Sequence, residues 1–122
     1  MTKIITRNDV ENILIQWQKC QIKAQDLHDW AENLYLKDGI DYEDWEQDES
    51  YSVTNEVLGA LDMMDMNLMT PEDVPAYLEF LKTPLGCYNE GYSKLEQYLQ
   101  QIDVEERRRL LSENPFYSIF CK

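Results

Sequence analysis

Neither a membrane-spanning segment nor a secretion signal is evident in this sequence of 122 residues. No run approaches the roughly 18 consecutive apolar residues that a transmembrane helix needs, and the first seven residues contain no apolar stretch long enough for a signal peptide. The three cysteines, Cys20, Cys87 and Cys121, are far apart and form no Cys-x-x-Cys pair, so we expect neither a disulfide framework nor a zinc site. These absences predict a cytoplasmic protein with reduced thiols.

Signatures of catalysis are equally scarce. The single histidine, His28, stands beside Asp29, and side chains one position apart do not face each other on a helix. There is no Gly-x-Ser-x-Gly nucleophile frame and no glycine-rich phosphate loop. We therefore expect a protein that is not an enzyme, with His28 at its surface or in an interface.

Carboxylates are abundant, but their spacing does not match common metal-binding patterns. A calcium loop needs glycine as its sixth residue and glutamate as its twelfth, whereas the glycine in the segment 38–41 (Asp-Gly-Ile-Asp) is second. A di-iron bundle needs Glu-x-x-His on facing helices, and the residue three positions before His28 is Gln25. We expect no metal site and no cofactor. Weak binding of divalent cations by the acidic loop stays an alternative. A third hypothesis is that the protein is an enzyme or a metal protein.

Positive charge is missing from the middle third of the chain. Residues 1–37 hold five bases and five acids, and residues 82–122 hold six of each. Residues 38–81 hold thirteen acids without one Lys or Arg, so the entire formal charge of −13 lies there. A negative surface disfavours nucleic acids and anionic membranes as partners. Concentrating like charges costs stability through repulsion, which favours a function that uses the electric field.

The densest part of this base-free segment is 38–49, with seven acids in twelve residues and aromatic rings between and after them. Rings supply buried area at protein interfaces, while acids steer a basic partner. We therefore predict a partner-binding surface made of Asp38, Asp41, Tyr42, Glu43, Asp44, Trp45, Glu46, Asp48, Glu49, Tyr51 and Glu56. The alternative is a solvated loop whose rings pack back onto the core and whose charge only keeps the protein soluble.

The hydrophobic pattern predicts an all-α fold, in which residues 1–122 form one domain, a single compact bundle of about five to six helices. We expect helices at about 7–20, 24–36, 50–64, 74–83, 86–101 and 103–112. Capping signals at Thr6, Thr70 and Asp103 mark helix starts, and Pro75 limits 71–74 to a single turn before the next helix. No alternating run is long enough to predict a strand.

Two C-terminal features point either to internal packing or to a second contact surface. The basic run 107–109 (Arg-Arg-Arg) can pair with nearby acids or form a second binding patch. The tail 116–120 is too apolar for a free end. It should dock on the bundle or on another copy of the chain, which leaves monomer and homodimer both open.

The order of several segments resembles small all-helical bacterial proteins, some of which resemble immunity proteins of contact-dependent inhibition or colicin-type toxins. The segments are a tryptophan-bearing first helix, residues 29–32 (Asp-Trp-Ala-Glu), the acidic stretch, residues 57–63 (Val-Leu-Gly-Ala-Leu-Asp-Met) and residues 68–75 (Leu-Met-Thr-Pro-Glu-Asp-Val-Pro). The resemblance covers about residues 8–82 and implies an inhibitor of a cognate toxin domain. The charge of the acidic segment is compatible with it, and together they lead us to expect a cytosolic inhibitor that occludes a basic toxin domain, most simply a nuclease. The other interpretation is a non-catalytic structural or regulatory helical module. Such a module could form a homodimer, and its acidic charge would only keep it soluble.

Overall fold

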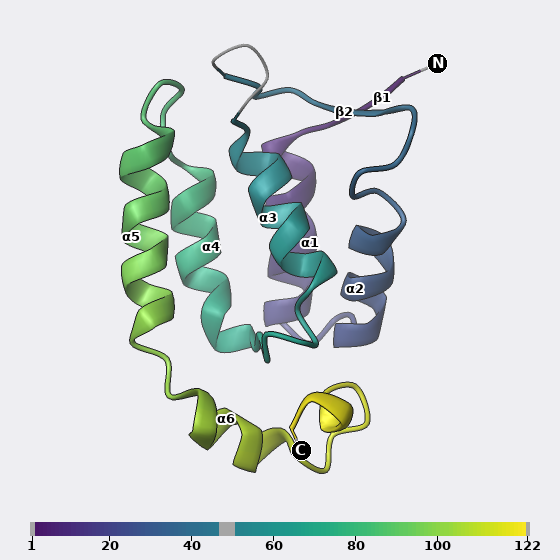
Figure 1. Cartoon of the computed structure of the whole chain (residues 1–122). Coiled ribbons are helices and arrows are strands. Elements are labelled where there is room, and N and C mark those ends of the chain that lie inside the picture. The colour runs from purple at the N-terminus through teal and green to yellow at the C-terminus, as the bar shows by residue number, and fades with distance from the viewer. Residues whose placement is uncertain (1, 47–50, 122) are drawn as a thin grey trace.

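The computed structural model describes residues 2–46 and 51–121. Its helices are α1 (Arg7–Gln18), α2 (Ala24–Glu32), α3 (Val53–Asp62), α4 (Val74–Leu81), α5 (Tyr88–Gln100) and α6 (Val104–Leu111), with 3-10 turns η1 (Pro71–Asp73) and η2 (Ser118–Phe120). Helices α1 to α5 lie side by side, and α6 with the C-terminal tail lies across the lower end of this body (Figure 1). The predicted helical bundle is confirmed. None of the helices in the described part of the chain is long and apolar enough to cross a membrane.

Local capping explains where the helices begin. Thr6 and Asp9 form a reciprocal capping box at the start of α1, with both hydrogen bonds 3.0 Å long. Asp103 accepts the Glu106 N–H at 3.0 Å at the start of α6. Thr70 precedes η1, and Pro75 then falls in the first turn of α4, where a helix needs no N–H donor. The predicted starts at these positions and the single turn at 71–73 are confirmed.

Two predicted helices end earlier than the sequence pattern suggests. The first ends at Gln18 instead of residue 20, and the second ends at Glu32 instead of residue 36. Cys20 and Leu36 have φ values of 61° and 56°, in the left-handed region, so the chain turns away from the helix axis at both. The third helix starts at Val53, with Ser52 as its N-cap, three residues after the predicted position.

A short sheet corrects the expectation that the chain contains no strand. β1 (Lys3–Ile5) and β2 (Ile40–Tyr42) run parallel, with Ile4 opposite Asp41. Each strand has only three residues, too few for an alternating pattern to appear in the sequence. The pairing fixes the start of the acidic segment beside the N-terminus of α1.

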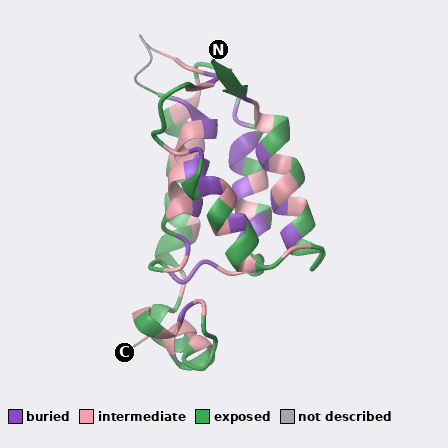
Figure 2. Ribbon diagram, turned by 90° about the vertical axis from the view of Figure 1, so that its right-hand side faces the viewer, coloured by how far each residue is buried: buried purple, intermediate pink, exposed green. Residues whose placement is uncertain are grey.

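The core lies between α1, α2, α3 and α4, where buried positions of these helices face inward (Figure 2). Its fully buried side chains include Val10, Leu14, Leu27, Leu58 and Leu61. Helix α6 buries none of its residues, so apolar packing alone does not hold it against the body. Its attachment depends on a polar contact described below.

Candidate functional site

Asp44 is not a surface residue. Its side chain is 4% exposed, and its carboxylate accepts hydrogen bonds from Ser52 Oγ, from the Thr54 N–H at 3.2 Å and from Arg7 Nε at 2.7 Å. Burial by itself raises the pKa of Asp44, but the bonds from Ser52, Arg7 and Thr54 outweigh it, and the net pKa is lowered. Asp44 thus joins the acidic segment to the starts of α1 and α3. Its predicted place in a binding surface is not retained.

Tyr42 also lies inside the fold, at 7% exposure, with its ring edge-on to Trp45 at a centroid distance of 5.5 Å. Burial raises the pKa of Tyr42 to about 12. Trp45 is half-buried, and its indole N–H donates to Asp41 Oδ1, which also accepts the Tyr42 N–H. These contacts confirm the alternative in which the rings pack back onto the core, as far as Tyr42 and Trp45 are concerned.

Other acids of the segment anchor it while still reaching solvent. Glu43 is exposed and accepts the Arg7 N–H at 2.8 Å, which places an anion at the N-terminus of α1. Glu46 is half-buried and accepts the Gly86 N–H from the turn between α4 and α5. Glu46 and Tyr51 also form two backbone hydrogen bonds with each other, from the Glu46 N–H to the Tyr51 carbonyl at 2.6 Å and from the Tyr51 N–H to the Glu46 carbonyl at 3.2 Å. Asp38 is exposed, and Asp48 and Glu49 lie outside the described residues.

Tyrosines of α5 extend the predicted surface. The rings of Tyr88 and Tyr92 are stacked, 5.8 Å apart at an interplanar angle of 8°, and the ring of Tyr51 lies 5.0 Å from that of Tyr88. Burial, and then the negative charge of half-buried Glu56, raise the pKa of Tyr88, so Glu56 lies close to this stack. We call Glu46, Tyr51, Glu56, Tyr88 and Tyr92 the aromatic-acidic face.

Sequence reasoning missed Tyr88 and Tyr92 because their three- and four-residue spacing with Leu95 and Tyr98 is typical of a core stripe. Both are half-buried instead, since α5 is the outermost helix of the body and only its Leu95 is buried. The sequence did contain a signal, since this helix has tyrosines at most of its apolar positions. A tyrosine hydroxyl favours a position that reaches water, which indicates a partly exposed helix face.

The basic run pairs internally. Arg107 contacts Asp73 through two hydrogen bonds of 2.7 and 2.8 Å, while Arg108 pairs with Glu105 and Arg109 with Glu106. The interpretation of this run as an internally paired face is confirmed. The tail also docks on its own body, because Tyr117 is buried and its hydroxyl donates to the Met69 carbonyl.

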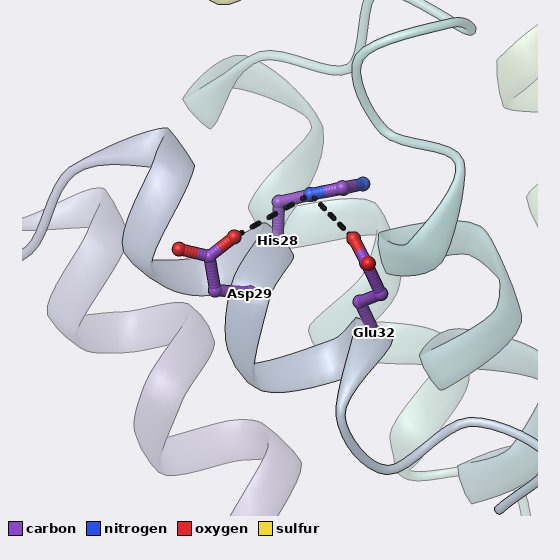
Figure 3. Close-up of side chains that lie close together, drawn as sticks. All are labelled: His28, Asp29 and Glu32. Atoms are coloured by element: carbon purple, nitrogen blue, oxygen red, sulfur yellow. Dashed lines mark ion pairs between the residues drawn. The ribbon is translucent and has the colours of Figure 1, made fainter.

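His28 lies on α2, and its side chain is only 13% exposed, so the structure does not bear out the surface position, while the alternative of an interface position stays a prediction. Figure 3 shows its ring reaching past two carboxylates of the same helix, with Nδ1 at 4.0 Å from Asp29 Oδ1 and 3.6 Å from Glu32 Oε2. On the other side Nε2 is 3.0 Å from the carbonyl oxygen of Asp62. These three residues are the only group of histidine, cysteine and acidic side chains spaced to hold a metal ion in the described chain.

No protein-family model, curated protein or solved structure matches this chain.

Proposed function

We propose that this protein is a non-catalytic inhibitor of the immunity type, which binds and occludes a basic toxin domain through the aromatic-acidic face and the neighbouring exposed acids Asp38 and Glu43. The observation that carries the proposal is the unbalanced charge of residues 38–81, which hold thirteen acids and no Lys or Arg. Within the described part of this segment, only Asp44, Glu72 and Asp73 lie within ion-pair distance of an arginine.

The acids left over create a negative field that no Lys or Arg of the described residues neutralises at ion-pair distance. In the described residues, those without a Lys or Arg at ion-pair distance are Asp38, Asp41, Glu43, Glu46, Glu56, Asp62, Asp65 and Glu79. Repulsion among them lowers stability, whereas a basic partner would neutralise them and gain a faster association.

The anchoring of the acidic segment supports the same proposal. Because Asp41, Glu43, Asp44 and Glu46 bond to the segment itself or to the body, the backbone of residues 41–46 is held in place. A binding surface that is ordered before contact loses less conformational entropy on association. The stacked rings of Tyr88 and Tyr92 add a partly exposed aromatic area, which interfaces use for buried contact.

A nuclease is the toxin class whose chemistry fits this surface best. A nuclease groove must be basic to bind the phosphate backbone, so an acidic protein can occupy it by offering carboxylates in place of phosphates. Occlusion of this kind requires no catalytic group on the inhibitor, and it depends on rapid, electrostatically steered binding.

The experiment first asks whether a secreted toxin gene lies directly beside the gene of this chain, and then compares two triple variants for binding to the toxin domain of that gene. One neutralises the proposed surface (Asp38→Asn, Glu43→Gln, Glu56→Gln), and the matched control removes the same charge elsewhere (Glu11→Gln, Glu105→Gln, Glu113→Gln). Binding kinetics measured at 50 and 300 mM NaCl should show association slowed by about tenfold, with a weaker salt dependence, for the first variant alone. Equal association rates for the two variants would contradict the proposal.

A second candidate, a structural or regulatory module that self-associates, is favoured by exposed apolar side chains near the C-terminus. Leu110 and Ile119 are 64% and 68% exposed. Sedimentation of the chain and of a Leu110→Gln, Ile119→Gln variant separates the two functions. If the unmodified chain sediments as a dimer and the variant as a monomer, the result supports the self-associating module.

A further inference from the structure

The imidazole of His28 has a fixed tautomer. Its Nε2 atom lies 3.0 Å from the carbonyl oxygen of Asp62 at the end of α3. A carbonyl can only accept a hydrogen bond, so Nε2 must carry the hydrogen, and in the neutral ring Nδ1 then holds the free lone pair. The ring of Phe116, from the docked tail, packs edge-on against the imidazole at 5.6 Å and helps to hold its orientation.

The Nδ1 atom is buried and lacks a hydrogen-bond partner among the described residues. Its ion-pair neighbours are Glu32 Oε2 at 3.6 Å and Asp29 Oδ1 at 4.0 Å, both beyond hydrogen-bond length. Ionised carboxylates offer no hydrogen to a lone pair. A buried lone pair that faces two anions is unfavourable unless a proton on Nδ1 or a metal cation lies between them.

The distances between the three side chains are somewhat longer than a bound metal ion would require. Three ligand atoms placed about 2.1 Å from a zinc ion at tetrahedral angles are separated by roughly 3.4 Å. Here the Nδ1-to-oxygen distances are 3.6 and 4.0 Å, and all three ligand atoms lie within 4.8 Å of one another. The carboxylates are 57% and 60% exposed, so side-chain rotations can bring their oxygens to coordination distance, and Asp29 Oδ1 would then exchange its hydrogen bond from exposed Gln25 for the metal.

We propose that His28 Nδ1, Asp29 and Glu32 bind a divalent first-row transition-metal ion of the zinc class. The imidazole nitrogen selects against Ca²⁺ and Mg²⁺, which prefer sets of oxygen ligands. The Nε2–H of His28 donates to the Asp62 carbonyl, and metal-bound histidines commonly use such a hydrogen bond from the other ring nitrogen to fix the orientation of the ring. Three protein ligands leave the fourth tetrahedral position to water. The site is separate from the aromatic-acidic face, so it stands or falls independently of the proposed function.

The sequence contained a usable signal for this site. His28 and Glu32 are four positions apart on α2, so their side chains meet on one face of the helix. The expectation of no metal site considered the calcium-loop pattern and glutamate three positions before the histidine, and neither pattern includes a glutamate four positions after it.

The test uses the full chain labelled with ¹⁵N and Zn²⁺ as the probe. Because the chain has one histidine, its imidazole gives a single pair of ring nitrogen signals. We expect one equivalent of Zn²⁺ to shift the Nδ1 signal while Nε2 keeps its hydrogen. Glu32→Gln and Asp29→Asn should each raise the dissociation constant by about tenfold or more. Glu79→Gln removes the same charge from an exposed position on α4 and should leave the constant unchanged.

Three results would overturn the site. The first is an Nδ1 signal that does not shift when Zn²⁺ is added. This result would also be seen if cysteine thiols alone held the zinc. The second is an Nδ1 atom that already carries a hydrogen in the metal-free chain and keeps it at millimolar Zn²⁺. The third is an affinity that Glu32→Gln and Asp29→Asn leave unchanged although circular dichroism shows both variants folded.

Discussion

The guanidinium of Arg107 holds both carboxylate oxygens of Asp73, with N-to-O distances of 2.7 and 2.8 Å. Asp73 is 1% exposed and also accepts the Tyr98 hydroxyl at 2.6 Å, so one carboxylate joins α6, α5 and the start of α4. Removing one partner of a buried ion pair leaves the other charge without compensation. We predict that Asp73→Asn lowers the free energy of unfolding by about 3 kcal/mol, measured by urea denaturation.

The neighbouring Glu72 supplies the control for that variant. Its side chain is 85% exposed and lies 3.9 Å from Arg107, a geometry in which an ion pair contributes little. Glu72→Gln removes the same charge and should change the free energy of unfolding by less than about 0.5 kcal/mol. Similar losses in both variants would mean that overall charge, and not the buried contact, stabilises this end of the molecule.

Asp44 should make stability depend on pH in the acid range. Its folded-state pKa is lowered by hydrogen bonds from Ser52, Arg7 and Thr54, which outweigh the opposite effect of burial. A lowered folded pKa gives stability that is present above the unfolded pKa of about 3.9 and is lost as the pH falls through the folded value. We expect Asp44→Asn to be less stable than the wild type by about 2 kcal/mol at pH 6. This difference should shrink below pH 4 in urea titrations, and a difference that stays constant down to pH 2 would contradict the assignment.

Gly91 brings α5 close to the end of α4. A Cβ atom at this position would lie 2.1 Å from Thr83 Oγ1 and 2.9 Å from Thr83 Cβ, and Thr83 is itself buried. Glycine-to-alanine changes inside helices usually stabilise by up to about 1 kcal/mol, but here overpacking should reverse the sign and destabilise by about 1–3 kcal/mol. Thermal unfolding of Gly91→Ala beside Ser93→Ala, an exposed position of the same helix, tests this. A stabilised Gly91→Ala variant would contradict this prediction, because it would mean that Thr83 can move away from the added methyl group at little cost.

Local features of the sequence predicted the helices, whereas the roles of the acids depended on distant contacts. The cap at Thr6 involves residues three positions apart, so it can be read from the sequence. The partner of Asp44 is Arg7, 37 positions away, and no periodicity reports such a contact. The sequence therefore left open which acids and rings of the segment 38–51 face the solvent and which pack onto the core. In the structure Asp44 and Tyr42 are buried and Glu46 anchors the turn at Gly86.

The concentration of acids in residues 38–81 should itself limit stability. Salt shortens the range of electrostatic repulsion, from a Debye length of about 30 Å at 0.01 M to about 8 Å at 0.15 M. We predict that the free energy of unfolding rises over this interval at pH 7, because repulsion opposes the folded state of a chain with a formal charge of −13. Urea denaturation at both ionic strengths measures the change.

Charge reversal locates the source of that repulsion. Asp38→Lys with Glu79→Lys places two bases in the base-free segment at exposed positions, which should raise the free energy of unfolding by a few tenths of a kcal/mol for each residue and flatten its salt dependence. The matched pair Glu96→Lys with Glu113→Lys changes the net charge equally, but at exposed positions in a third of the chain whose charges already balance. A clearly larger gain for the first pair would show that the segment gives up stability through its local field, as expected of a surface kept for a basic partner. Equal gains would mean that the net charge acts as a whole, and would favour the interpretation in which the acids only keep the protein soluble.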